Sequence, residues 1–412
     1  MKPSFYNFYK RDNGLVLIYN SASGNCIVIK EAELSSFMAT SLSDSDTKKM
    51  LELGFFVDDN VNEMDKLIHN AYSNLSNSKK DKYRILTTTA CNARCPYCYE
   101  SGVKPVTMTY ETADKVVEFI LDKSKNQKII EIEWFGGEPL VNKEIISYIS
   151  NKILKLKPKT LKYEASIITN GYLLDEEAIS VMINDWFIKR IQITLDGTAD
   201  VYEKIKGLGK NSFHKVIDNI RLLCNFDLEI DIRLNFDENN IENMKTLIEY
   251  ISTLPFKDKL YVYPAKINNE FRSENFALEK ETITMYNTLH KYNLIRGKKL
   301  LPKTMKNPCA ASKKSYFTIH ATGGLFKCDR KLLDNNSVGS VHNFLIKPIS
   351  DTSEWENINP ELKCKSCKMF PLCWGGCIYE KIKKLDRCYI TENIIYNNLS
   401  LILSELIERN IS

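Results

Sequence analysis

Long hydrophobic runs are missing from this chain of 412 residues. No apolar stretch reaches the ~18–20 residues that a membrane-spanning helix needs. The N-terminus, MKPSFYNFYKRDNG, contains no hydrophobic signal segment. We therefore expect no membrane partner and no export, and we predict a cytoplasmic protein. Disulfides are rare in that reducing compartment, where clustered cysteines indicate metal binding instead.

A strong charge of either sign is missing as well. The 57 basic and 52 acidic residues leave a net charge of +5, which is modest for this length. No basic stripe with interleaved aromatic residues is present, so we expect no nucleic-acid partner. The hydrophobic fraction of 43% is enough for ordinary cores, and the length suggests two or three domains.

Cysteine is present in an informative arrangement, because ten of the 12 cysteines fall into two spaced arrays. Thiolates are the usual ligands of iron–sulfur clusters, and a cluster normally takes four of them. The first array, in the stretch TTTACNARCPYCYES, offers only three, which leaves one iron open to an outside ligand. The alternatives are a disulfide framework and, for Cys364 and Cys367, a zinc ribbon. The first array is Cys91, Cys95 and Cys98, and the second is Cys309, Cys328, Cys364, Cys367, Cys373, Cys377 and Cys388.

The chain divides by pattern into three segments. Residues 1–78 contain LVLIYN and NCIVIK around SASG, which predicts a hairpin, and two short helical patterns follow. The polar stretch SNLSNSKKDK at residues 73–82 predicts a linker. Residues 301–412 are cysteine-rich and short of regular pattern, apart from a predicted closing helix in NIIYNNLSLILSELIER, so they would need clusters for their order.

Residues 82–300 alternate strand and helix patterns, which predicts an α/β fold with a parallel sheet and outer helices. We interpret this segment as a partial barrel of the (β/α)6 kind, with its site at the carboxyl ends of the strands. The six predicted strands are YRILTTT, IIEIEWF, YEASIIT, IKRIQITL, LEIDIRLNF and KLYVYPA. The five predicted helices are ETADKVVEFILDKS, KEIISYISNKILKL, DEEAISVMIND, FHKVIDNIRLLC and NIENMKTLIEYIST.

Polar motifs follow these strands in order. The first cysteine array comes after the first strand, and a glycine-rich motif comes after the second. Each motif has an ordinary structural explanation, such as a Gly-Gly turn or a surface ion pair of Arg233, but their order at successive strand ends indicates one site. The later motifs are Gly136-Gly137-Glu138-Pro139, then Thr169-Asn170-Gly171, then Thr194 and Asp196, and then Arg233 and Asn235.

The first array resembles the motif of the radical SAM enzymes, Cys-x3-Cys-x-aromatic-Cys, with Tyr97 as the aromatic residue. The resemblance implies a [4Fe–4S] cluster held by Cys91, Cys95 and Cys98, with S-adenosylmethionine (SAM) on the open iron. In that family one electron cleaves SAM, and a 5′-deoxyadenosyl radical then abstracts hydrogen from a substrate carbon.

The resemblance also implies SAM contacts for Tyr97 and for the motifs after the later strands. Gly136, Gly137, Glu138 and Pro139 would bind the amino group, and Thr169 and Asn170 the nucleoside. Thr194 would lie near the ribose, and Arg233 could pair with the carboxylate. Many relatives carry His and Arg after the fourth strand, where this chain has Tyr202 and Lys206. That difference puts the local contact in question, because Lys cannot replace a bidentate Arg.

The second array resembles the SPASM extension, which implies two auxiliary [4Fe–4S] clusters and three clusters in all. By this resemblance Cys364, Cys367, Cys373 and Cys388 hold the distal cluster, and Cys309, Cys328 and Cys377 hold the near one. Members with a fully ligated near cluster carry another cysteine soon after the first, and this chain does not. The near cluster would then have an open or non-cysteine site, which could accept a substrate thiolate, and the alternative is closure by water or by a protein oxygen or nitrogen. Asp329 resembles the proposed base of sulfatase-maturating relatives, and the alternative is a solvated carboxylate beside Arg330.

The first 78 residues resemble the winged-helix-like peptide-recognition domain of peptide-modifying radical SAM enzymes, which binds a leader by strand addition. We therefore predict a maturase that forms a thioether or carbon–carbon crosslink in a ribosomally made precursor peptide with a leader. A flavodoxin- or ferredoxin-type protein would donate electrons. The alternatives are an anaerobic sulfatase-maturating, formylglycine-forming enzyme and a non-enzymatic electron carrier with several clusters.

Overall fold

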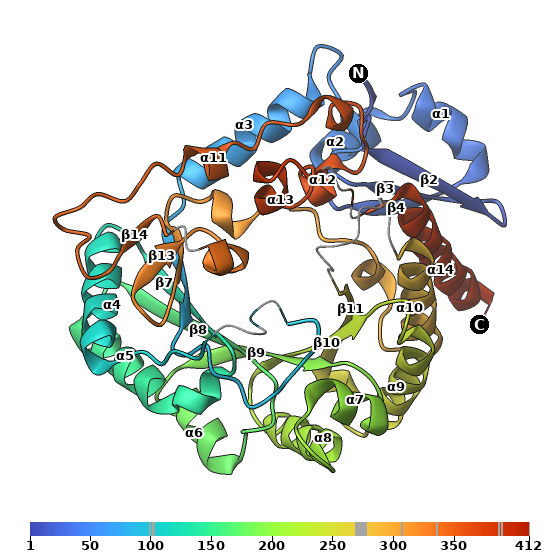
Figure 1. The fold of residues 1–412 in the computed structure, drawn as a ribbon. Helices are drawn as coiled ribbons and strands as arrows, with labels where there is room; N and C mark the ends of the chain where they lie inside the picture. Colours follow the sequence, from blue (N-terminus) through green and yellow to red (C-terminus); the bar gives the residue numbers. More distant parts are fainter. Residues whose placement is uncertain are drawn as a thin grey trace. The chain divides into compact units, whose positions relative to one another are not determined.

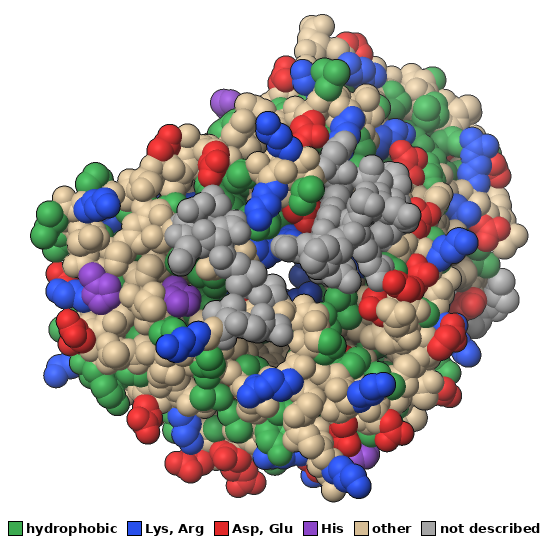
Figure 2. Space-filling model, in the orientation of Figure 1, with side chains coloured by type: hydrophobic (Ala, Val, Ile, Leu, Met, Phe, Trp, Pro, Cys, Tyr) green, Lys and Arg blue, Asp and Glu red, His purple; other side chains and the backbone are tan. Residues whose placement is uncertain are grey.

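A computed structural model describes residues 1–98, 100, 104–267, 278–305, 308–334, 337–385, 388 and 390–411. Within these residues, no helix is both long enough and apolar enough to cross a membrane. On the face seen in Figure 2, basic and acidic side chains are interspersed among the described residues.

The chain forms two compact units that each combine distant segments. One unit contains Met1–Asn77, Arg272–Ser312 and Asn357–Ser412, and the other contains Ser78–Phe271 and Lys313–Glu356. The division of the chain into segments 1–78, 82–300 and 301–412 as functional domains stays a prediction. We call the second group the barrel unit and the first group the terminal unit.

The barrel unit is built on six consecutive parallel strands in the order β11-β10-β9-β8-β7-β6 (Figure 1). Each strand lies where the alternating sequence predicted one, so the predicted α/β fold with a parallel sheet is confirmed. The strands are β6 (Lys80–Leu86), β7 (Ile129–Phe135), β8 (Lys162–Thr169), β9 (Ile188–Leu195), β10 (Glu229–Phe236) and β11 (Leu260–Lys266).

Helices follow the strands and cover the outer face of this sheet (Figure 1). On β7 the side chains of Ile130, Ile132 and Trp134 face the helices and are fully buried, while Glu131 and Glu133 face the concave side and are half-buried. The helices are α4 (Tyr110–Lys123), α5 (Lys143–Leu156), α6 (Glu176–Asn184), α7 (Ala199–Lys206), α8 (Ser212–Leu223) and α9 (Ile241–Thr253). All except α7 were predicted from the sequence.

The concave face of the sheet is charged. Lys80, Lys82 and Arg84 on β6 form ion pairs with Glu131 and Glu133 on β7 at distances of 2.5 to 3.1 Å. They line a cavity of about 840 Å³. The helices therefore bury the apolar face of the sheet, and the polar face surrounds an open interior.

The sheet continues beyond β6 with three short strands that the sequence pattern did not predict. β12 (Tyr316–Ile319) pairs parallel to β6, and β13 (Gly324–Phe326) and β14 (Gly339–Ser340) continue antiparallel. Cys328 and Asp329 follow β13 after a single residue, Lys327, and Asp329 begins the 3₁₀ helix Asp329–Asp334. This unit also contains α11 (Ser353–Glu356).

The terminal unit contains a three-stranded antiparallel sheet, β2 (Asn7–Asp12), β3 (Leu15–Asn20) and β4 (Cys26–Lys30). The hairpin of β3 and β4 confirms the prediction, and β2 was missed. The short helices α1 (Leu34–Met38) and α2 (Asp44–Leu53) also lie where they were predicted, and β1 (Lys2–Pro3) pairs with β5 (Phe56–Val57).

The predicted linker at residues 73–82 is shorter than expected, because α3 (Glu63–Ser76) covers its first four residues and β6 begins at Lys80. The boundary between the two units falls inside it, between Asn77 and Ser78. α3 is amphipathic, and its apolar side packs against the cysteine-rich segment. There Ala71 lies in one core with Cys364, Phe370 and Trp374. The polar residues that suggested a linker lie on the opposite, exposed side of the helix.

The remaining helices of the terminal unit come from the later part of the chain. The predicted closing helix is confirmed as α14, and α10 was not predicted. They are α10 (Glu279–Lys291), α12 (Phe370–Cys373), α13 (Ile378–Ile382) and α14 (Glu392–Ile411).

Candidate active site

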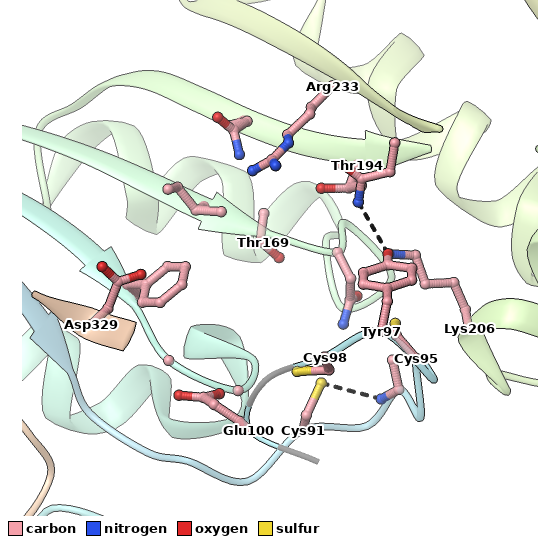
Figure 3. Close-up of a pocket in the computed structure, with 18 of the residues that line it drawn as sticks. Cys91, Cys95, Tyr97, Cys98, Glu100, Thr169, Thr194, Lys206, Arg233 and Asp329 are labelled. Atoms are coloured by element: carbon pink, nitrogen blue, oxygen red, sulfur yellow. Dashed lines mark hydrogen bonds between the residues drawn. The ribbon is translucent and has the colours of Figure 1, made fainter. Parts of the chain in front are cut away.

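The first cysteine array lies on the loop that joins β6 to α4, at the carboxyl end of the parallel sheet. An isolated antiparallel bridge between Thr88 and Thr107 closes the base of the loop. Cys91, Cys95 and Cys98 are half-buried free thiols, and Figure 3 shows them on one stretch of this loop. The structure therefore places the array where the barrel pattern predicted it.

The thiols are close enough to influence one another. Burial raises the pKa of the Cys91 thiol to about 11, and the charges of Glu138, Cys95 and Cys98 act in the same direction. A bound metal reverses this tendency, because metal ions deprotonate coordinating thiols. Three neighbouring thiols on one loop fit a cluster with one open iron. Among the described residues, no three His, Cys, Asp or Glu side chains are grouped as ligands of a single metal ion.

Gly136 and Gly137 bring the end of β7 against the cysteine loop. A Cβ atom on Gly136 would collide with the carbonyl oxygen of Thr88, and one on Gly137 would collide with that of Ala90. The Gly137 and Glu138 amides donate to these same two oxygens at 3.2 and 2.9 Å. Glycine is needed here because the two backbones touch, and the contact fixes the loop from below.

The Glu138 carboxylate is fully buried and accepts three hydrogen bonds. Its donors are the Thr169 hydroxyl at 2.6 Å, the Asn170 amide at 2.8 Å and the Leu140 amide at 3.1 Å. Burial raises its pKa, against the effect of these donors. Glu138 thus joins the ends of β7 and β8. Pro139, which begins the 3₁₀ helix Pro139–Asn142, is also buried. The contacts of Glu138 and Pro139 with SAM stay a prediction.

A pocket of about 370 Å³ opens above the cysteine loop (Figure 3). Several polar atoms in its wall are buried and have no hydrogen-bond partner among the described residues, namely Glu100 Oε1, Arg233 Nε and Asn235 Oδ1. Such atoms are costly unless a ligand satisfies them. The wall includes the predicted residues Cys91, Cys95, Tyr97, Cys98, Gly136, Gly137, Thr169, Asn170, Thr194, Arg233 and Asp329. The donor set fits a polar ligand with amino, carboxylate and hydroxyl groups.

Tyr97 is held by a buried polar cluster at one side of this pocket. Its hydroxyl donates to Asp196 at 2.5 Å, and Lys206 forms an ion pair with the same carboxylate at 2.8 Å. Burial alone would lower the pKa of Lys206, but Asp196 and Tyr97 outweigh it and the pKa is raised well above its usual value. Lys206 is therefore charged inside the protein.

Asp329 reaches the opposite side of the pocket from the loop after β13. Arg84 binds it at 3.0 Å and binds Glu133 at 2.5 Å, so this arginine lies between two carboxylates. Glu100 lines the same pocket, and burial, with a further contribution from Asp329, raises its pKa to about 7. Sequence reasoning missed Arg84 and Glu100. The alternation KDKYRIL, with Arg84 on the concave side, is the signal that could have identified Arg84.

The predicted ligands of the distal cluster lie together in the terminal unit. Burial raises the pKa of the Cys373 thiol to about 11, and charges on Cys367, Cys364 and Cys388 raise it further. A Cβ atom on Gly375 would lie 3.4 Å from Cys364 Sγ, so the turn after Cys373 returns to the first of these cysteines.

The predicted near set is divided between the two units. Cys309 and Cys377 belong to the terminal unit and Cys328 to the barrel unit. Their role as ligands of one cluster stays a prediction. None of the 12 cysteines is in a disulfide in the structure.

Comparison with known proteins agrees with this geometry. Residues 85–251 match the model of the Radical SAM superfamily. The cysteine-type anaerobic sulfatase-maturating enzyme of Clostridium novyi is 24% identical over 323 residues, which cover 70% of this chain and 84% of that enzyme. The same-named enzyme of Clostridium perfringens strain 13 is 24% identical over 70% of this chain and 86% of its own length.

Two solved structures share the fold. Native anSMEcpe with bound AdoMet is 20% identical and has a TM-score of 0.63, covering 80% of this chain and all of that one. Streptococcus suis SuiB bound to precursor peptide SuiA is 14% identical with a TM-score of 0.50, covering 93% of this chain and 96% of that one. Together with the cysteine loop at the first strand end, the family match shows that residues 85–251 form a radical SAM domain, and the two solved structures show the fold.

Proposed function

We propose that this chain is a radical SAM maturase that forms a thioether or carbon–carbon crosslink in a ribosomally made precursor peptide. Cys91, Cys95 and Cys98 hold the cluster in this proposal, and the second array holds two auxiliary clusters. When bound, the cluster and SAM supply a carbon radical that takes hydrogen from the substrate.

The observation that carries the proposal is the sheet of residues 7–30. Among the described residues, no strand pairs with the outer edge of β4, and Val28 on that strand is 38% exposed. A free antiparallel edge is what strand addition of a leader requires. The structure with a precursor peptide covers 93% of this chain, whereas anSMEcpe covers 80%. The larger coverage favours a substrate with a leader.

Other side chains of this protein would bind SAM and accept a proton. Thr169, Asn170, Thr194 and Arg233 line one pocket with the cysteines and would bind the nucleoside and carboxylate parts of SAM. Asp329, oriented by Arg84, lies in the same wall and would receive a proton when the substrate is oxidised. The auxiliary clusters would accept the accompanying electron, and a flavodoxin- or ferredoxin-type protein would supply the first one.

Formylglycine formation on a sulfatase is the second candidate, supported by the names of the relatives at 24% identity. The products separate the two reactions. A cysteine-containing peptide that is crosslinked keeps its sulfur and loses two hydrogens, whereas formylglycine formation replaces the sulfur by oxygen. Mass spectrometry of a short cysteine-containing peptide encoded beside this chain, after co-expression, decides between them. A sulfur-free product would contradict the maturase.

The first array is tested by replacing Cys91, Cys95 and Cys98 together with Ala. Iron should fall by only about one cluster of four atoms, because the second array remains intact. SAM cleavage should stop, because the cluster that binds SAM is lost. Undiminished release of 5′-deoxyadenosine from this variant would overturn the ligand assignment. It would leave no role for the radical SAM loop.

The leader site is tested with proline in β4, at Val28 and separately at Ile29. Amides of consecutive strand residues face opposite sides, so one proline removes a bond to β3 and the other removes only an outward donor. The outward variant should fold normally and bind the peptide at least about tenfold more weakly. Unchanged binding by both folded variants would contradict strand addition at β4.

A further inference from the structure

Lys206 is an unusual buried lysine. It is the last residue of α7, and only 4% of it is exposed. Lysine is almost never buried this fully unless it is paired. Gly207 follows with φ +63 and ends the helix, so the chain turns away while the lysine side chain points into the wall of the pocket.

The side chain of Lys206 completes a network around Tyr97. Asp196 uses both carboxylate oxygens, one with Lys206 Nζ at 2.8 Å and the other with the Tyr97 hydroxyl at 2.5 Å. Lys206 Nζ also donates to the Tyr97 hydroxyl at 3.3 Å, and Asn235 Nδ2 donates to it at 3.2 Å. Figure 3 shows Lys206 beside the Tyr97 ring. The phenol is thus held in one position by three different strand or helix ends.

The backbone of Lys206 holds the same loop. The Arg94 amide, between Cys91 and Cys95, donates to the Lys206 carbonyl at 2.7 Å. The Cβ of Arg94 lies 3.4 Å from the place that a Cβ on Gly207 would occupy. Side chain and backbone of one residue therefore bind the cysteine loop at two points.

The charge of Lys206 lies beside the cysteine loop, because its Nζ donates to the hydroxyl of Tyr97, the residue directly before Cys98. Lys206 lines one pocket with Cys91, Cys95 and Cys98, and its charge acts on the Cys98 thiol against the rise in pKa that burial causes. Lys206 also interacts electrostatically with Cys95. A fixed positive charge near a redox centre favours its more negative, reduced form, and does so strongly away from water.

We propose that Lys206 is a positioning residue that ties Tyr97 and the cysteine loop to α7, and that its charge makes a cluster on Cys91, Cys95 and Cys98 easier to reduce. The second half rests on the proposed ligands of the cluster, while the first half concerns the protein alone. Lysine supplies here, with a single ammonium group, both a link to Asp196 and a charge beside the thiols.

The charge is tested on the full, reconstituted chain with Lys206→Met, and with Lys204→Met as the matched control on the exposed side of the same helix. The measurement is a redox titration of the paramagnetic signal that changes when SAM is added. At the potential that reduces half of the wild-type cluster, Lys206→Met should lower the ratio of reduced to oxidised cluster about tenfold. Lys204→Met should leave it unchanged. Equal ratios in the two variants would overturn the electrostatic role.

Lys206→Met leaves the Asp196 carboxylate buried without its cation, which could prevent folding. Two further variants therefore separate the effect of the charge from an effect of misfolding. The double variant K206M/D196N removes both charges and leaves no unpaired one, and it should still lower the ratio, because the charge of Lys206 acts on the thiols of Cys95 and Cys98. Lys206→Arg keeps the charge and should stay within about threefold of the wild type. A wild-type ratio in the folded double variant would contradict the proposal.

Positioning is tested without any cluster. In the iron-free protein, amide hydrogen exchange of residues 91–98 should be faster in Lys206→Met than in Lys204→Met, because the side-chain contact to the loop is lost. Equal exchange would overturn the positioning role. If the SAM-sensitive signal persists after the three cysteines are replaced, the cluster assignment is wrong, and the exchange experiment still decides the role of Lys206 in the loop.

Discussion

At the scale of single residues, the cysteine loop is held by contacts that allow no extra atom. Gly137→Ala would place a methyl group against the carbonyl oxygens of Ala90 and Thr89, so the loop would have to move. We expect a destabilisation of about 1–3 kcal/mol and a marked loss of iron from the first cluster. Gly339→Ala, whose added Cβ would have ordinary contacts at 3.6 Å, is the control. Iron per chain and thermal unfolding measure both effects, and full iron in Gly137→Ala would show that the loop tolerates the shift.

The charged concave face predicts a pH dependence. Burial alone would raise the pKa of Glu133, but Arg84 and Lys82 outweigh it and hold the pKa below its usual value of 4.5. The stabilisation by this carboxylate is therefore present above pH 4.5 and is lost as the pH falls through the lower folded-state value.

Glu133→Gln tests this dependence. At pH 7 it should lower the thermal midpoint, with a loss of about 1–3 kcal/mol in stability. The loss should be much smaller at an acidic pH below the lowered pKa of Glu133, where the wild-type carboxylate is itself protonated. The exposed pair of Lys115 and Glu118 provides the control, because Glu118→Gln should change little at either pH. An equal loss at both pH values would mean that the size or shape of the side chain matters, and not its charge.

At the scale of helices and strands, the six strands of the barrel were predictable from their sequences. Apolar residues that face the helices alternate there with polar or charged residues that face the concave side, as in β6 and β7. The helix α7 was missed for the opposite reason. It has only eight residues, and its buried face carries Tyr202 and Lys206, which do not form an apolar stripe. β12 to β14 have two to four residues each, too few to show a period.

The site was also predictable only in part from the sequence. Motifs at strand ends follow from the chain order, so the cysteine loop, Thr169, Thr194 and Arg233 could be placed together in advance. The alternation in β6 could place Arg84 on the concave face. The contacts of Arg84 and Glu100 with Asp329 could not be predicted, since Asp329 comes more than 200 residues later and reaches the pocket from the loop after β13.

The helix α3 carries a prediction of its own, because it packs on the second cysteine array. Ala71 is 1% exposed in the core that contains Cys364 and Trp374. Ala71→Glu would bury an unpaired charge there, so we expect a loss of about 3 kcal/mol or more and of the iron bound by the distal set. Tyr72→Glu, one position on and 37% exposed, should change neither. Normal iron content in Ala71→Glu would show that the helix is not needed for this cluster.

At the scale of the whole molecule, residues 1–77 are part of a unit that also contains the closing helix and most of the second array. Phe8 contacts Tyr396 on α14, and Lys368, beside Cys367, donates to the carbonyl of Asn7 at 3.0 Å. Deletion of residues 1–77 therefore removes more than a peptide-binding surface.

We expect the deleted chain to lose auxiliary iron, falling from about twelve atoms per chain toward about four to eight if all clusters are of the four-iron type. It should also unfold at a lower temperature, because α3 no longer covers Phe370 and Trp374. The proline variant of β4 with the outward amide removed is the matched control, since it should lose peptide binding while keeping its iron. If the deleted chain keeps all its iron and its thermal midpoint, and loses only peptide binding, then residues 1–78 are an independent docking domain and the shared core around Cys364 contributes little to cluster retention.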